Sequence, residues 1–208
     1  MTLPAKPDVD VARSTREFIL AVALRQFAER GFHATSITEI ADEVGIRRPS
    51  LLHHFPSKEA LYREVLLGSF ADWGALVEEA VTEPVEGWAQ VERVIRAAFD
   101  FFEHHPEFVR LVRHEALDGG PLLKELLRLH LRPMFNRAVG YLEAEMDEGH
   151  LRRFDARHLL LAGYGAALSY FSDAPFIEAL IDDDPVGRRP LDAHCELVLA
   201  IFRNALEP

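Results

Sequence analysis

Apolar residues recur at helical spacing through almost the whole chain. Between Gly and Pro residues they return every three or four positions, which places them on one face of a helix, and no stretch alternates apolar and polar residues long enough to require a strand. The pattern therefore predicts an all-α protein. The expected helices span residues 14–30, 36–44, 48–54, 57–81, 88–104, 107–117, 122–148, 156–171 and 193–206.

Capping residues mark the ends of the first three expected helices. Ser14 and Ser36 each precede a Glu by three positions, the pattern of a capping box, in which the serine oxygen accepts from the backbone N–H of that Glu. Gly31 and Gly45 follow the first two helices, where a left-handed residue is often needed. Pro49 fits the first turn of the third helix. Two short helices joined by a tight glycine turn indicate a helix-turn-helix, whose second helix enters the DNA major groove.

The predicted organisation is an N-terminal three-helix head at residues 1–56 and a C-terminal helical bundle at residues 57–208. The longest nearly apolar run, residues 159–171, has 13 residues, fewer than the roughly 18 that cross a bilayer. The first ten residues lack the basic start and apolar stretch of a secretory signal. We therefore expect a cytoplasmic protein with no membrane partner.

Charge is distributed unevenly between the two parts. The net charge of −11 disfavours general nucleic-acid binding. Residues 1–70, however, hold nine basic and nine acidic side chains, so all the net acidity lies in the remainder. Residues 47–63 contain four basic residues and one glutamate. A small basic patch on a neutral module can bind phosphates locally while the rest of the protein repels them.

The segment 36–61, SITEIADEVGIRRPSLLHHFPSKEAL, resembles the helix-turn-helix signature of the TetR/AcrR family of transcriptional regulators. The resemblance is carried by Ile40-Ala41, Gly45-Ile46, His54-Phe55 and the run PSKEAL at 56–61. It is close over about residues 14–66, and beyond about residue 70 only length and all-α character match. The resemblance implies a DNA-binding head and a C-terminal bundle that dimerises and binds a small-molecule ligand.

Three positions depart from the family's usual residues. Arg47 stands where Ser or Thr is usual, Pro49 where Gly is usual, and Leu52 where a tyrosine commonly reaches the DNA. Leu52 cannot make that contact, so more of the recognition falls to Arg47 and Arg48.

Most candidate DNA contacts lie near the N-termini of the helices expected at 36–44, 48–54 and 57–81, whereas His53 and His54 lie at the end of the helix expected at 48–54. A guanidinium can bridge O6 and N7 of guanine or clamp a phosphate, and the N–H groups of a helix start favour an anion. Leu51 offers a contact to a thymine methyl group but could equally belong to the core. By resemblance, His54 is a phosphate donor and His53 a groove or backbone contact. The expected DNA-binding residues are Ser36, Thr38, Arg47, Arg48, Ser50, Leu51, His53, His54 and Lys58.

Metal binding is not expected at the adjacent His53 and His54. Neighbouring positions on a helix lie about 100° apart, and neither histidine has a partner four residues away. We expect no metal and no cofactor.

Aromatic residues are numerous in the body, where most should form its core. Some are expected to line an apolar effector cavity between the helices, with nearby cationic side chains as its polar handle. The expected ligand-binding residues are Phe99, Phe102, Phe108, Arg110, Arg113, His114, Phe135 and Tyr164.

The helices expected at 156–171 and 193–206 are the candidate interface of a homodimer. The first contains Gly163 and Gly165, small residues that let another helix approach closely, and the second carries an apolar stripe. The alternative is packing within one chain. Two recognition helices related by a two-fold axis can read a palindromic operator.

The sequence thus predicts a homodimeric DNA-binding transcriptional regulator, a repressor that a small-molecule effector releases from its double-stranded DNA operator. A transcriptional activator remains an alternative, as does a ligand- or protein-binding module with a non-functional helix-turn-helix. An enzyme is not expected, because the chain has no HExxH motif and no Gly-rich phosphate loop.

Overall fold

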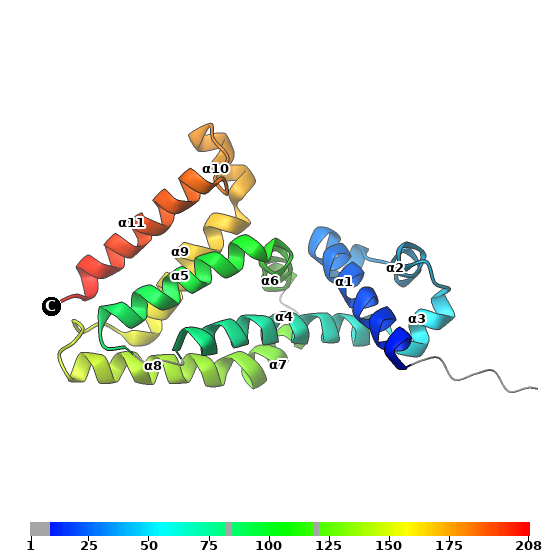
Figure 1. The fold of residues 1–208 in the computed structure, drawn as a ribbon, viewed down its shortest axis with the longest axis horizontal. Helices are drawn as coiled ribbons and strands as arrows, with labels where there is room; N and C mark the ends of the chain where they lie inside the picture. The colour runs from blue at the N-terminus through cyan, green and yellow to red at the C-terminus, as the bar shows by residue number, and fades with distance from the viewer. Residues whose placement is uncertain (1–8, 82–84, 119–120) are drawn as a thin grey trace, which may run out of the picture.

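The computed structural model of the chain describes residues 9–81, 85–118 and 121–208. These residues form helices and no strand, which confirms the all-α prediction (Figure 1). No helix among them is both long and apolar enough to cross a membrane. The helices are α1 Val9–Ala34, α2 Ile37–Val44, α3 Arg48–His54, α4 Lys58–Val81, α5 Trp88–His104, α6 Pro106–Asp118, α7 Pro121–Leu126, the π-helix η1 Leu127–Leu131, α8 Arg132–Asp147, α9 Ala156–Ser172, α10 Ala174–Ile181 and α11 Arg188–Leu206.

The head consists of α1, α2 and α3, and its apolar core holds α3 at one end of the molecule (Figure 1). Phe27, Ile40 and Leu51 are each 0% exposed and meet in this core. Gly45 adopts φ 77°, the left-handed conformation predicted for the turn between α2 and α3. Pro49 lies in the first turn of α3. The predicted helix-turn-helix is therefore present.

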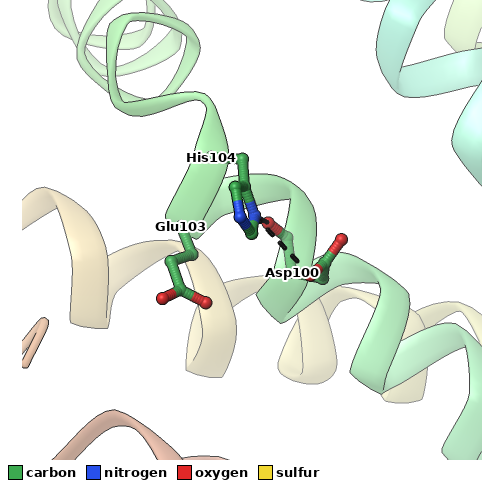
Figure 2. Close-up of side chains that lie close together, drawn as sticks. All are labelled: Asp100, Glu103 and His104. Carbon is green, nitrogen blue, oxygen red and sulfur yellow. Dashed lines mark hydrogen bonds and ion pairs between the residues drawn. The ribbon is translucent and has the colours of Figure 1, made fainter. Parts of the chain in front are cut away.

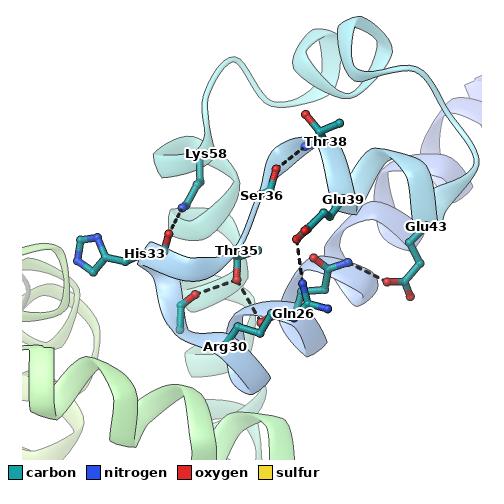
Figure 3. A network of polar contacts seen from close by, with 10 residues as sticks. Gln26, Arg30, His33, Thr35, Ser36, Thr38, Glu39, Glu43 and Lys58 are labelled. Atoms are coloured by element: carbon teal, nitrogen blue, oxygen red, sulfur yellow. Dashed lines mark hydrogen bonds and ion pairs between the residues drawn. The ribbon is translucent and has the colours of Figure 1, made fainter.

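Both predicted capping boxes are wrong. Helix α1 begins at Val9, so Ser14 lies inside the helix and cannot cap it. Ser36 does cap α2, but its Oγ accepts from the backbone N–H of Thr38 at 3.2 Å. The Glu39 carboxylate accepts instead from the Arg30 guanidinium at 2.8 Å (Figure 3). The Arg30 guanidinium is a charged donor, so it attracts the Glu39 carboxylate more strongly than a neutral backbone N–H does.

The body is built around α5, which packs against α4, α9 and α11. Helix α4 belongs to both parts, because it leaves the head beside α1 and continues into the body beside α5 (Figure 1). The helix expected at 122–148 is divided into α7, η1 and α8. Pro133 lies in the first turn of α8, and since proline has no N–H to donate, the preceding turn widens into a π-helix.

Two helical segments were not predicted. Helix α10 lies where the sequence predicted no element, and α11 begins at Arg188, five residues before the helix expected at 193–206. Pro175 and Pro190 lie near the starts of these helices. A proline is tolerated in the first turn of a helix, where its missing N–H has no helical partner.

Candidate nucleic-acid interface

An open groove of about 510 Å³ lies where the starts of α2, α3 and α4 converge. The first turns of these helices present backbone N–H groups without helical partners, and the helix dipoles add positive potential. Such a groove favours an anion. The residues that line it are Thr35, Ser36, Ile37, Thr38, Arg48, Leu52, Pro56, Ser57 and Lys58.

The first turn of α4 stabilises the negative charge of one of the protein's own side chains, the carboxylate of Glu59. Ser57 caps this helix, its Oγ accepting from the backbone N–H of Ala60 at 3.1 Å. A backbone hydrogen bond at Glu59, together with a hydrogen bond from Ser57, lowers the pKa of the Glu59 carboxyl below its usual value. The carboxylate form is thus preferred at the edge of the groove.

Arg47 and Arg48 are exposed at the start of α3, next to the groove. Arg47 is the N-cap residue, and its side chain makes no capping hydrogen bond. Within the described part of the chain, neither guanidinium forms an ion pair. Ser50 is also exposed, one turn into the helix. Two cations and a hydroxyl are therefore presented to solvent from one end of α3.

For Leu51 the sequence left both a DNA contact and a core position open, and the structure places this residue in the core. The side chain is 0% exposed and belongs to the head core. It lies on the inner face of α3, and its carbonyl accepts the backbone N–H of the buried Phe55 at 2.9 Å. Leu51 holds the helix in place and cannot reach a base.

The two histidines of α3 lie apart. His53 is exposed and His54 is half-buried, with ring centroids 6.1 Å apart and planes at 69°. His53 faces solvent and could reach a duplex directly, whereas His54 lies at the edge of the head.

Lys58 lies in the groove but is engaged within the head (Figure 3). Its ammonium donates to the carbonyl oxygen of His33 at 3.2 Å and lies 4.5 Å from the centre of the Phe32 ring. The contact ties the start of α4 to the end of α1. A phosphate must compete with the His33 carbonyl for this ammonium.

A polar network behind the groove fixes α2 against α1 (Figure 3). Gln26 donates to Glu43 at 2.8 Å, and Arg25 also bonds to Glu43. Thr35 Oγ1 donates to the carbonyl oxygen of Gly31 at 2.8 Å, at the kink that ends the regular part of α1. The helix starts that form the groove are thus held by a network of which Thr35 alone, among the residues named here, also lines the groove.

The ligand-site candidates of the body divide into two groups. Phe99, Phe102 and Phe108 are buried, and they pack with Trp73, Phe101 and Phe171 into one aromatic cluster. Phe102, for example, stacks on Trp73 with centroids 5.1 Å apart. Phe135 is half-buried, whereas Arg110 and Tyr164 are exposed.

Arg113 and His114 contact other parts of the molecule and do not together supply polar groups to that aromatic cluster. Arg113 binds Ser172 and Asp173, and the His114 ring lies against Gly31 of the head. The next residue, Glu115, bonds to Tyr62. These contacts could not be predicted from the sequence, since the pattern of apolar residues carries no signal for a buried carboxylate such as Glu115.

Two groups of carboxylates and histidines in the body deserve comparison with metal sites. Asp100, Glu103 and His104 are all exposed on α5, with their potential ligand atoms within 4.8 Å of one another, and Figure 2 shows His104 turned toward Asp100. In the second group, Glu145 already accepts from the backbone N–H of Gly87 at 2.6 Å and bonds to His150 at 3.1 Å. In each group the histidine already has a local partner, Asp100 for His104 and Glu145 for His150, and neither group carries an argument for an ion.

Comparison with known proteins agrees with this geometry. Residues 19–65 match the model described as bacterial regulatory proteins, tetR family, and residues 84–201 match the tetracyclin repressor-like C-terminal domain. The chain is 32% identical over 165 residues to the HTH-type transcriptional regulator RutR of Escherichia coli K12, covering 79% of this chain and 77% of RutR.

Solved structures show the same fold over nearly the whole chain. The ketosteroid transcriptional regulator KstR2 of Mycobacterium tuberculosis superposes with a TM-score of 0.69 at 26% identity, covering 93% of this chain and 95% of KstR2. AibR, in complex with isovaleryl coenzyme A and operator DNA, has a TM-score of 0.75 at 17% identity, with coverage of 90% and 97%. The chain therefore belongs to the tetR family of bacterial regulatory proteins and is a helix-turn-helix transcriptional regulator.

Proposed function

We propose that this regulator is a homodimeric repressor that binds a palindromic DNA operator and leaves it when a small molecule binds the body. The observation that carries the proposal is the groove between the starts of α2, α3 and α4, with two exposed arginines beside it. The regulator acts by binding alone, without catalysis, and in the cytoplasm, where bacterial DNA lies. Residues 1–56 form the DNA-binding domain and residues 57–208 the ligand-binding and dimerisation domain.

The DNA contacts come from the three helix starts around the groove. Arg47 and Arg48 reach base edges or phosphates from α3, because a guanidinium can bind guanine with two hydrogen bonds. The hydroxyl groups of Ser36 and Thr38 bind a phosphate at the start of α2, where the helix dipole also favours an anion. The remaining proposed contacts are Ser50, His53, His54 and Lys58.

A second copy of the chain covers the outer faces of α9 and α11. Leu161 on α9 is 53% exposed, and Leu197 and Ile201 on α11 are 56% and 57% exposed. Exposed apolar side chains gathered on two neighbouring helices are typical of an interface. A two-fold axis through this face supplies two recognition helices, as a palindrome with half-sites about one helical turn apart requires.

The effector binds within the body, near the aromatic cluster that contains Phe99, Phe102 and Phe108. A relative of the same fold, AibR, is known in complex with isovaleryl coenzyme A and operator DNA. To release the operator, the effector must bind more tightly to a body conformation in which the two heads are wrongly placed for the DNA.

Selection of duplexes from a random library tests the proposal. We expect the parent protein to enrich one palindromic sequence. Arg48→Ala should weaken binding to the selected duplex by about 1 to 3 kcal/mol, because a specific contact is lost. Arg137→Ala is the matched control, since Arg137 forms an exposed ion pair with Glu78 in the body, at 2.8 Å. A parent that enriches no sequence, even in dilute buffer, refutes the proposed function.

A reporter assay separates repression from activation. The selected operator is placed across the start of a promoter, and a bound repressor should lower transcription there. Higher transcription in the presence of the protein would identify an activator instead.

A further inference from the structure

His194 of α11 lies at one end of the aromatic cluster of the body. Its ring stacks on Tyr170 with centroids 3.9 Å apart and planes at 8°, and it lies 5.9 Å from the centre of the Phe99 ring. Phe99 lies 5.8 Å from Phe171, and Phe171 lies 5.8 Å from Phe102. The imidazole therefore continues the set of aromatic rings near which the effector is proposed to bind.

One nitrogen of this imidazole has no hydrogen-bond partner. Nε2 of His194 is buried, and no polar atom of the described residues bonds to it. The ring does form one hydrogen bond, to the backbone of Ala166 on α9. Since Nε2 is without a partner, the other ring nitrogen, Nδ1, makes this bond by donating its proton to the Ala166 carbonyl oxygen. Nε2 then carries a lone pair and can only accept.

The imidazole is uncharged at neutral pH. Burial lowers the pKa of His194 below its usual value, and the bond to Ala166 offsets this only in part. A buried acceptor without a partner costs free energy, which a hydrogen-bond donor would recover. The ring thus favours a partner with an O–H or N–H group. It disfavours a carboxylate or a phosphate, whose oxygens are themselves acceptors.

The surrounding charges also disfavour an anion. Burial and the Ala166 bond account for the shifted pKa of His194, with no contribution from a charged side chain of the described residues. Near the adjacent Tyr170, Asp184 and Asp183 add to burial in raising the pKa of the hydroxyl. An anionic ligand would therefore find no cation at the imidazole and two carboxylates beside the ring that stacks on it.

The end of the cluster that holds His194 is closer to the surface than its centre. His194, Ala166 and Phe171 are half-buried, whereas Phe99 and Phe102 are buried. A ligand can approach Nε2 from this end, with its apolar part against Phe99 and Phe171, and does not have to pass through the whole core.

Resting on the proposed function, we propose that His194 supplies the hydrogen bond of the effector site, and that the effector is a neutral, largely apolar molecule with a hydroxyl or N–H group. The donor group of the effector binds Nε2 of His194, and its apolar part packs against Phe99 and Phe171. A site built to bond a hydroxyl rejects the analogue that lacks it, because its own polar group is then left unpaired. His194 thus selects alcohols, phenols and amides over carboxylates of the same shape.

A matched set of small aromatic probes tests the proposal. p-Cresol carries a hydroxyl donor, 4-methylanisole replaces it with an ether that only accepts, and p-toluate replaces it with a carboxylate. Each probe is titrated into the full-length protein, and the NMR signals of the His194 ring report binding. p-Cresol should bind about twofold to tenfold more tightly than 4-methylanisole, which corresponds to one hydrogen bond. p-Toluate should bind more weakly than either.

Two variants and one spectrum show whether His194 causes this preference. His194→Phe keeps an aromatic ring beside Tyr170 but has no acceptor, so p-cresol should lose its advantage over 4-methylanisole, as followed by the aromatic signals of the probes. His130→Gln removes an exposed histidine of η1 and should keep the preference of the parent. Nitrogen-15 NMR of the parent should show Nδ1 protonated and Nε2 bare, with the Nε2 signal moving when p-cresol is added.

The proposal is overturned if p-cresol does not bind the parent, if it binds no better than 4-methylanisole, or if p-toluate binds best. It is equally overturned if Nε2 of the unliganded parent carries the proton, or if His194→Phe keeps the preference. Should His194→Phe fail to fold, the probe series and the spectrum of the parent decide alone.

These outcomes are separate from the test of the proposed function, which is the selection of duplexes. A parent that enriches a palindrome but shows no preference among the probes loses only the role of His194. A parent that prefers p-cresol but enriches no duplex loses the proposed repressor function and keeps the ligand site.

Discussion

The ammonium of Lys58 donates to the carbonyl oxygen of His33 across 3.2 Å, and this bond closes one side of the groove between the helix starts. Lys58 also lies 4.5 Å from the centre of the Phe32 ring, so the cation is shared between the end of α1 and the first turn of α4. In the absence of DNA its charge is satisfied within the head.

Lys58→Met tests whether this cation turns to the DNA. We expect weaker binding to all duplexes alike and a plot of log affinity against log salt whose slope is reduced by about one, because one phosphate contact is lost. Lys58→Arg should preserve most of the slope. An unchanged slope in Lys58→Met would mean that the ammonium stays on the His33 carbonyl in the complex.

Gly31→Ala should destabilise the protein by about 1 to 3 kcal/mol, the cost of holding a side chain in a backbone region that favours glycine. Gly31 has φ 75° and ψ 171°. Denaturant unfolding measures the loss. Gly140→Ala is the control, because Gly140 lies within α8 with nothing within 4 Å of an added Cβ. That variant should be neutral or more stable, since alanine favours a helix. Equal stability of the two variants would contradict the strain at Gly31.

Leu51→Ala should destabilise the head by about 2 to 5 kcal/mol, because it leaves a cavity in a packed core. Leu51 is 0% exposed, whereas its neighbour Leu52 is half-buried and lines the groove. Leu52→Ala should therefore lose less stability. Hydrogen exchange of α1 to α3 locates the effect. A Leu51→Ala variant as stable as the parent, with altered DNA sequence preference, would restore Leu51 as a base contact.

His194 should make the body sensitive to acid. Its ring stacks on Tyr170 with centroids 3.9 Å apart, and burial lowers the pKa of His194, partly offset by a hydrogen bond to the backbone of Ala166. The folded pKa is thus below the unfolded value near 6.5. As the pH falls from that value toward the folded pKa, the unfolded chain binds more protons, so the contribution of His194 to stability is lost.

Denaturant unfolding at pH 7.5 and pH 5.5 checks this behaviour. His194→Phe can retain the stacking on Tyr170 but cannot be protonated, so its free energy of unfolding should fall less between the two pH values than that of the parent. Removal of the exposed His130, in His130→Gln, should leave the acid sensitivity of the parent unchanged. The assignment fails if His194→Phe is as acid-sensitive as the parent.

Local signals were sufficient to predict the helix-turn-helix. Gly45 between two short amphipathic segments and Pro49 in a first turn each act within a few residues, and both adopt the expected roles. The same local reasoning failed where a partner lay farther along the chain. Glu39 fits a capping box by spacing, yet it pairs with Arg30 of the preceding helix.

The candidate site was predictable by position more than by side-chain role. The exposure of Arg47 and Arg48 could be predicted, because both residues lie at the start of α3. A helix of seven residues is too short, however, for its apolar spacing to decide whether Leu51 or Leu52 faces the core. The hydrogen bond between Tyr62 of α4 and Glu115 of α6 had no sequence signal, because it joins residues 53 positions apart. Such pairs are set by tertiary packing and not by any local pattern.

Helix α4 is continuous over 24 residues from the groove into the body. At a rise of about 1.5 Å per residue it is roughly 36 Å long, so a tilt of about 10° at its body end displaces its other end by about 6 Å. That displacement is close to the length of two base-pair steps along the DNA. A helix of this length converts a small rotation at one end into a large displacement at the other. A rotation too small to disrupt the packing of the body is therefore large enough to move a recognition helix out of register with the bases.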